Sequence, residues 1–168
     1  MRTLVASWAL LGVLVLLGQA LWRLTPIALE PISTGTLTGG QWALMIAWVL
    51  ISIYSEGYRG FHLRFSPRTA ARALYVADHP TLARVLLAPA FCLGLFGATR
   101  KVLIVAWGFP VIILGLVLLV RTLSQPWRGI IDAGVVIGLG LGVLSLLWFF
   151  ARGLAGHAPP VDPQVPAG

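Results

Sequence analysis

The sequence predicts an all-α fold, a polytopic transmembrane bundle of five helices in a single domain over residues 1–152. The first observation is composition. Hydrophobic residues make up 58% of the 168 residues and charged residues only 10%, against roughly a quarter charged in typical soluble domains. The second observation is that the apolar residues fall into long segments. A segment of about 20 residues crosses the hydrocarbon core as a helix.

Five apolar segments are the expected spans, and basic residues lie at or near most of their ends: 3–22, 41–58, 79–99, 102–120 and 130–150. The first could instead be a cleaved signal peptide, because residues 18–20 resemble a small-x-Ala cleavage site. Its apolar run is longer than a usual signal core, which favours a span. Residues 24–40 are rich in Pro, Gly and Thr and are expected to form a loop. The Pro/Gly-rich residues 153–168 are expected to be a disordered tail.

Residues 52–72 join the second and third spans and hold much of the polar chemistry of the chain. Gly57 and Gly60 are expected to weaken the helix there. Ser66-Pro67 then predicts the start of a short helix over residues 67–77, lying in the plane of the membrane surface.

The third span, residues 79–99, has a competing interpretation. It contains Pro89 and Arg84, so it could be a re-entrant or interfacial segment rather than a crossing helix. That alternative gives four spans and places the C-terminus in the cytoplasm. Segment length favours five spans.

The five-span topology divides the basic residues unequally, and the positive-inside rule then makes the richer side cytoplasmic. The richer side holds Arg2, Arg59, Arg64, Arg68, Arg72, Arg84, Arg121 and Arg128, and the other holds Arg23, Arg100, Lys101 and Arg152. The N-terminus is therefore expected inside and the C-terminus outside. The strong preference for Arg over Lys favours a bacterial inner membrane as the location.

Two acids, Glu56 and Asp132, are expected at or inside the edge of a span. A lone carboxylate there is costly, so each is expected to have a cationic partner or water. The predicted pairs are Glu56 with Arg128 and Asp132 with Arg59. Such pairs could fix helix register, or they could form a site for a substrate, an ion or a proton.

The cytoplasmic edge as a whole is a candidate lipid or substrate site. A juxtamembrane cluster of arginines attracts anionic lipid at about 1 kcal/mol per residue, although the same residues also serve as topology signals. The candidate residues are Glu56, Arg59, His62, Arg64, Arg68, Arg72, Arg128 and Asp132.

The fifth span carries a helix-packing pattern. Gly134, Gly138 and Gly142 recur every four residues, which creates a small-residue face that lets another backbone approach closely. This face could pack within the chain, for example on Gly108 or Gly115, or against a second copy. Asp132 is expected to point away from it.

No catalytic residue, metal or cofactor is expected. Cys92 is the only cysteine, which excludes an intrachain disulfide and a Cys-based metal site. His62 and His79 do not form a HExxH motif, and a P-loop, a dinucleotide-binding fingerprint and a nucleophile elbow are absent. The net charge of +7 lies mostly at span ends, so a nucleic acid is not an expected partner.

The leading functional hypothesis is a small, non-catalytic inner-membrane subunit or accessory protein whose basic edge contacts anionic lipid. Its expected partners are membrane lipids and a membrane protein or a second copy of the chain. The first alternative is a transporter of a small solute, an ion or a lipid that uses Glu56 and Asp132. The second is a membrane-embedded enzyme acting on a lipid or prenyl phosphate, with Glu56 or His62 as acid or base.

Overall fold

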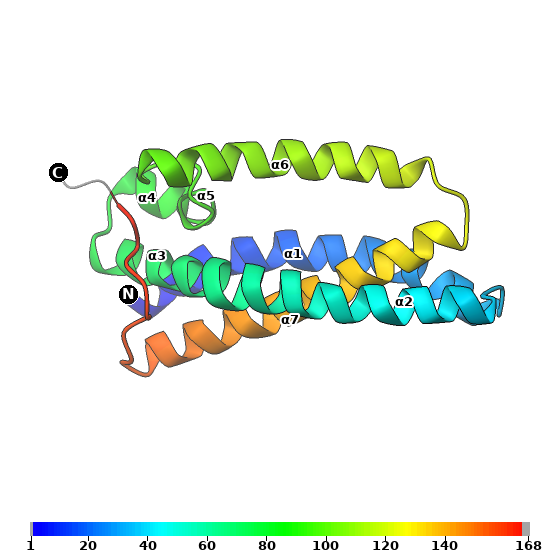
Figure 1. Ribbon diagram of the computed structural model, residues 1–168. Helices are drawn as coiled ribbons and strands as arrows, with labels where there is room; N and C mark the ends of the chain where they lie inside the picture. The colour runs from blue at the N-terminus through cyan, green and yellow to red at the C-terminus, as the bar shows by residue number, and fades with distance from the viewer. Residues whose placement is uncertain (1, 166–168) are drawn as a thin grey trace.

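The computed structural model describes residues 2–165 as an all-helical bundle, with no strand in that range. Four helical rods run side by side along its length, and each rod is antiparallel to the one before it in the chain (Figure 1). The all-α prediction is confirmed. The five-span prediction is wrong for the third span, and this changes the end of the bundle at which later residues lie.

The first rod is α1 (Arg2–Ser33), which extends well beyond the predicted span into the predicted loop. Pro26 and Pro31 both lie inside the helix. Proline is tolerated there because neighbouring helices and side chains satisfy the backbone groups that it frees. Pro31 is fully buried and packs against Gly129, whose ideal Cβ position lies 2.5 Å from Pro31 Cγ. The loop is therefore limited to residues 34–38.

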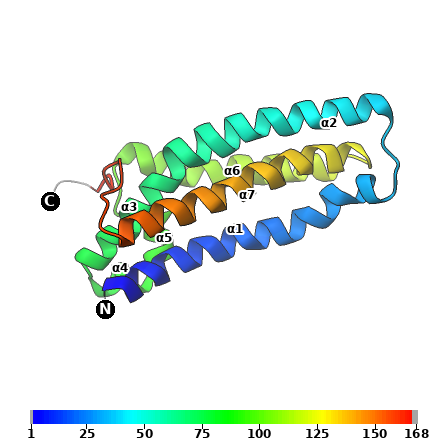
Figure 2. The ribbon, with the colours of Figure 1, turned by 90° about the horizontal axis from the view of Figure 1, so that it is seen from below.

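The second rod is an unbroken helix made of α2 (Gly39–Ser52), the π-helix η1 (Ile53–Phe65) and α3 (Ser66–Asp78). It begins with a capping box in which Thr38 and Gln41 satisfy each other's backbone N–H groups. Gly57 and Gly60, which were expected to weaken the helix, lie inside it, because the chain passes through that stretch in the wider π geometry. The expectation of a surface-lying helix over residues 67–77 is also wrong, because α3 is the most buried segment of the rod. It lies at the end of the bundle where α1 starts and α7 ends (Figure 2).

Residues 79–99 form no crossing helix, which corrects the third predicted span. They contain α4 (Leu82–Leu86), α5 (Ala88–Cys92) and a series of turns, all at one end of the bundle. Gly94 and Gly97 have φ angles of +81° and +56°, a conformation that glycine adopts readily and that ends a helix. Of the two interpretations, the segment corresponds to the non-crossing one.

The last two rods are α6 (Arg100–Arg121) and α7 (Trp127–Leu154). Because residues 79–99 turn back, α6 starts at the end of the bundle where α1 also starts, and α7 returns to that end. Residues 155–165 then lie against α3, where Arg72 Nη1 donates to Pro163 O at 2.8 Å. The two ends of the described chain thus lie at the same end of the bundle, rather than on opposite sides as five spans require (Figure 1).

Three of these helices, α1, α6 and α7, are long and apolar enough to cross a membrane. We call the end that holds the start of α1 and the end of α7 the basic end. Its basic residues are Arg2, Arg68, Arg72, Arg84, Arg100, Lys101 and Arg152. The loop between α6 and α7, with Arg121 and Arg128, lies at the opposite end.

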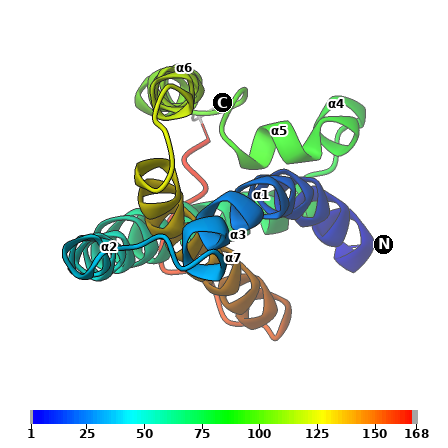
Figure 3. The same cartoon turned by 90° about the vertical axis from the view of Figure 1, so that its right-hand side faces the viewer.

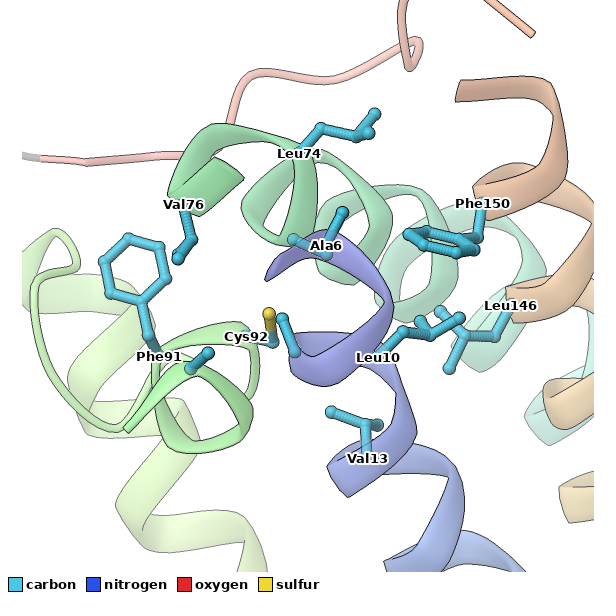
Figure 4. Packing of buried hydrophobic residues seen from close by; sticks show 12 residues of the cluster. Ala6, Leu10, Val13, Leu74, Val76, Phe91, Cys92, Leu146 and Phe150 are labelled. Atoms are coloured by element: carbon cyan, nitrogen blue, oxygen red, sulfur yellow. The ribbon is translucent and has the colours of Figure 1, made fainter. Parts of the chain in front are cut away.

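The main apolar core joins α1, α3, α5 and α7 near the basic end (Figure 4). The α1 side chains recur at helical spacing on the face that meets the other helices. The labelled core residues are Ala6, Leu10, Val13, Leu74, Val76, Phe91, Cys92, Leu146 and Phe150. A smaller cluster around Ala28 and Ile130 closes the opposite end. The short helix α5 is therefore part of the core.

Cys92 gives a direct test of this core. Its side chain is 1% exposed, and burial raises the pKa of its thiol to about 12. Since the thiolate is the reactive form, we expect a maleimide to leave Cys92 unmodified in the folded protein and to modify it after denaturation. Mass spectrometry of the intact chain measures both states. Rapid modification of the folded protein would contradict the packing of α5.

Candidate functional site

The glycine face of α7 forms a close-packed seam with the second rod. The glycine face of α7 receives side chains from α2 and η1 along its length. An ideal Cβ on Gly134 lies 2.6 Å from Ser52 Oγ, and one on Gly138 lies 2.7 Å from Glu56 Oε2. At Gly142 the position of a Cβ is taken by the ring of Phe61. The structure thus places the predicted glycine face inside the chain, against polar and aromatic side chains rather than against Gly108 or Gly115.

The π geometry of η1 decides which residues enter this seam. Glu56, Phe61 and Ser66 are five residues apart, the spacing that i→i+5 hydrogen bonds bring onto one face. In an α-helix, residues at this spacing would point in different directions. Phe61 meets Gly142, and Ser66 donates its hydroxyl to Gly142 O at 3.4 Å. The π-helix therefore keeps Glu56, Phe61 and Ser66 against α7.

Glu56 lies near the middle of the bundle. Its side chain crosses Gly138, which is about 15 Å along the helix from Arg128 and about 21 Å from Arg152. Glu56 is partly buried and forms no ion pair with any residue of the range 2–165. One helical turn away, Ser52 Oγ is buried and has no hydrogen-bond partner in that range. The seam therefore holds two unpaired polar groups side by side.

His62 lies in the part of the seam that is nearer the basic end. Its Nδ1 lies 2.9 Å from Ser145 Oγ of α7. The rings of Tyr58, Trp148 and Phe149 surround it, with centroids 5.8, 5.8 and 5.2 Å from the imidazole. Ser145 is three residues beyond Gly142 on the same face of α7, so helical periodicity could have identified it. The sequence analysis did not name Ser145 or the pairing.

Asp132 lies six residues before Gly138 on α7 and forms its ion pair with Arg128, so both predicted cross-pairs are wrong. Asp132 Oδ2 lies 3.8 Å from Nε of Arg128, one turn earlier on its own helix. Gln125, in the preceding loop, donates to Glu30 Oε2 at 2.8 Å and to Ile27 O at 3.3 Å. This polar cluster closes the opposite end of the bundle. The pairs were predicted on the assumption that residues 79–99 cross, which would have placed both clusters at one edge.

Arg72 is also placed differently from the expectation. It is fully buried, so its guanidinium cannot contact a lipid headgroup. It donates to four backbone carbonyls from three separate segments and lies over the Phe91 ring, 3.9 Å from the centroid. The acceptors are Phe91 O at 2.6 Å, Pro163 O at 2.8 Å, and Phe96 O and Gly97 O at 3.0 Å. Burial lowers the pKa of Arg72 to about 10, which leaves it charged at neutral pH.

The remaining candidate residues do not gather in one place. Arg59 and Arg64 are exposed on the outer side of η1, and Arg68 is only partly exposed on α3. Arg2 forms an ion pair with Asp78 at 2.6 Å. This pair borders a surface pocket of 460 Å³ between α3 and residues 156–163. The residues predicted to form one cytoplasmic edge are thus divided among the seam, the outer face of η1, the buried position of Arg72 and the opposite end of the bundle.

Fold and site together define an all-helical protein with three helices suited to crossing a membrane and a polar seam at mid-length. Comparison with protein-family models, with curated protein sequences and with solved structures found no match. Within residues 2–165, no group of three or more His, Cys, Asp or Glu side chains is arranged to hold a metal ion.

Proposed function

We propose that this chain is a small, non-catalytic subunit or accessory protein of a bacterial inner membrane, with its basic end in the cytoplasm. Its role is to present a helix surface to another membrane protein while the basic end contacts anionic lipid. The observation that carries this proposal is the position of α6.

Helix α6 stands apart from the rest of the bundle (Figure 3). Only Val102 is buried along its 22 residues. Near its start, Trp107 Nε1 donates to Leu95 O at 3.1 Å, and Val102 packs against Gly94. In lipid, apolar surface alone does not drive helices together, and close backbone approach at small residues contributes much of the association. Gly108 and Gly115 have open space at their Cβ positions, so both are accessible to a partner helix.

The orientation follows from the distribution of charge. Basic residues are concentrated at the basic end, whereas Arg23, Arg121 and Arg128 lie toward the other end. The positive-inside rule then favours a cytoplasmic basic end, with both described chain ends inside. If the second rod also crosses, the chain has four spans. The exposed Arg100 and Lys101 of the basic end are the best candidates for contact with lipid phosphate.

The enzyme hypothesis loses support from the geometry. It requires Glu56 or His62 as acid or base beside phosphate-binding arginines. Glu56 is at mid-length, His62 is bonded to Ser145, and Arg72 is occupied by backbone carbonyls. The transport hypothesis named Glu56 and Asp132 as gating or proton-coupled groups. Since Asp132 pairs with Arg128 toward the opposite end, transport is better tested at Glu56 alone.

Mass spectrometry of the protein extracted in native-lipid nanodiscs tests the proposal. We expect a membrane protein at fixed stoichiometry. A photo-crosslinking side chain at Gly115 should capture that protein, and the same probe at Leu16, which is exposed on α1, should capture it far less. A chain found alone with one enriched lipid, and with equal crosslinking from both positions, would contradict the subunit proposal and favour lipid binding or transport.

A further inference from the structure

We propose that Glu56 is a proton-binding site at the middle of the bundle, in which the carboxyl group is held neutral at physiological pH. This goes beyond the subunit proposal, because it assigns a chemical property to the seam whatever the partner of α6. The inference stands on the position of Glu56, on the groups that face it and on the neighbouring Ser52.

The position makes an ionised carboxylate costly. Gly138 lies near the middle of α7, so the Glu56 side chain across it is far from both ends of an apolar helix. A charged group at such a depth needs a partner or water, whereas the neutral acid costs much less to bury. A carboxyl group that finds no cation there is therefore expected to hold its proton.

The groups facing Glu56 include no cation in contact with it. On α7 it meets Gly138, and the neighbouring Gly57 meets Leu141. The charged residues of α7 lie toward its two ends: Arg128 is beside Asp132, and Arg152 lies 4.9 Å from the Trp148 ring centroid.

The second rod and α1 provide no contacting cation either. On η1, Arg59 is exposed and His62 is bonded to Ser145. Arg72 is committed to four carbonyls. On α1, Arg2 pairs with Asp78 at the basic end, and Arg23 forms no ion pair with any described residue.

Ser52 supplies the second, independent observation. The residue is 1% exposed, and its hydroxyl has no hydrogen-bond partner among the residues described. It points at Gly134, one turn of α7 before the Gly138 that Glu56 crosses. A buried hydroxyl without a partner is costly. Ser52 and a neutral Glu56 can act as hydrogen-bond donor and acceptor to each other, and both face the glycine face of α7, at Gly134 and Gly138.

The π-helix holds this arrangement in place. Short π segments inside α-helices occur frequently at functional sites, and here the π segment begins directly after Ser52. The five-residue spacing places Phe61 in the seam next to Glu56, on the side toward the basic end. Ser52, Glu56 and Phe61 thus meet Gly134, Gly138 and Gly142, which lie on successive turns of α7.

Dicyclohexylcarbodiimide tests the proposal, since it reacts with protonated carboxyl groups in apolar surroundings. The carboxyl oxygen bonds to the carbodiimide carbon, and the acid's proton moves to nitrogen. An acyl shift then leaves a stable N-acylurea whose mass is the sum of the reactants. We expect an adduct on Glu56 of the full chain in nanodiscs near neutral pH, decreasing as the pH is raised. Glu30, which is exposed, and Asp78, which is paired, should remain unmodified.

Two variants make the result decisive. Glu56→Gln should abolish the adduct and leave the thermal unfolding temperature unchanged, because a neutral amide replaces a neutral acid. Arg59→Leu should leave the adduct yield unchanged. Absence of the adduct from the wild-type chain would overturn the proposal, whether or not the Arg59→Leu variant forms it. Protection of Glu56 by sodium chloride but not by choline chloride would also overturn it, because the site would then bind a cation. A failed search for a partner of α6 affects none of these outcomes.

Discussion

Replacing Gly138 with leucine is expected to destabilise the protein by about 3 kcal/mol, the upper part of the usual range for overpacking. An ideal Cβ at this position lies 2.7 Å from Glu56 Oε2 and 3.0 Å from Glu56 Cβ. The Cβ contact belongs to the fixed base of the side chain, so a rotamer change cannot relieve it. The second rod must move away from α7, which also loosens the contacts at Gly134 and Gly142. Thermal unfolding in detergent, monitored by circular dichroism, measures the effect.

Gly140→Leu is the matched control. Gly140 is two residues away on the same helix, and nothing lies within 4 Å of its ideal Cβ. The same substitution there should change the free energy of unfolding by less than about 0.5 kcal/mol, as is usual for surface sites. Equal destabilisation by both variants would mean that leucine acts through the α7 backbone, and the seam would then not be the tight contact described.

Replacing Arg72 with methionine is expected to destabilise the protein by about 3 kcal/mol or more, because buried carbonyls lose their donor. The Arg72 guanidinium binds Phe91 O, Phe96 O, Gly97 O and Pro163 O. It therefore joins α3 to α5, to the glycine turns and to the tail. Methionine fills a similar volume but donates no hydrogen bond. We expect a lower unfolding temperature and earlier proteolysis of residues 155–165.

Arg72→Lys and Arg64→Met are the comparisons. Lysine keeps the charge but lacks the planar fork that reaches several acceptors at once, so its effect should be intermediate. Arg64 is exposed on η1, and its change to methionine should leave unfolding and tail proteolysis nearly unchanged. If Arg72→Met left the tail as protected as in the wild type, the link between α3 and the tail would be wrong.

The third predicted span shows where sequence reasoning failed. Residues 79–99 have the length and apolarity of a crossing helix, and both quantities were assessed correctly. The segment turns back because Gly94 and Gly97 adopt positive φ angles and because Arg72 binds the carbonyls of this region. Arg72 is more than twenty residues away from Phe96 and Gly97, so no local pattern predicts that contact. This one error reversed every later helix and produced the wrong ion pairs.

The candidate site shows a similar division. The four-residue spacing of Gly134, Gly138 and Gly142 correctly indicated a face of close approach on α7, and Glu56 was recognised as a costly acid. Their contact with each other was not foreseen, because the five-span topology placed Glu56 at a cytoplasmic edge beside Arg128 rather than at mid-length against Gly138. The π geometry carries the helix through this stretch, and a spacing of five residues is not a pattern used to recognise helices.

The sequence by itself determined the class of the protein: an all-helical chain with apolar segments long enough to cross a membrane and a basic bias at their ends. These properties are local, since the hydropathy, length and glycine spacing of a segment do not depend on its neighbours in space. Only the tertiary structure decided which segments form long helices, which arginine is buried and where Glu56 lies. Those outcomes depend on contacts between residues far apart in the chain, where a buried polar group must find its partner in another segment.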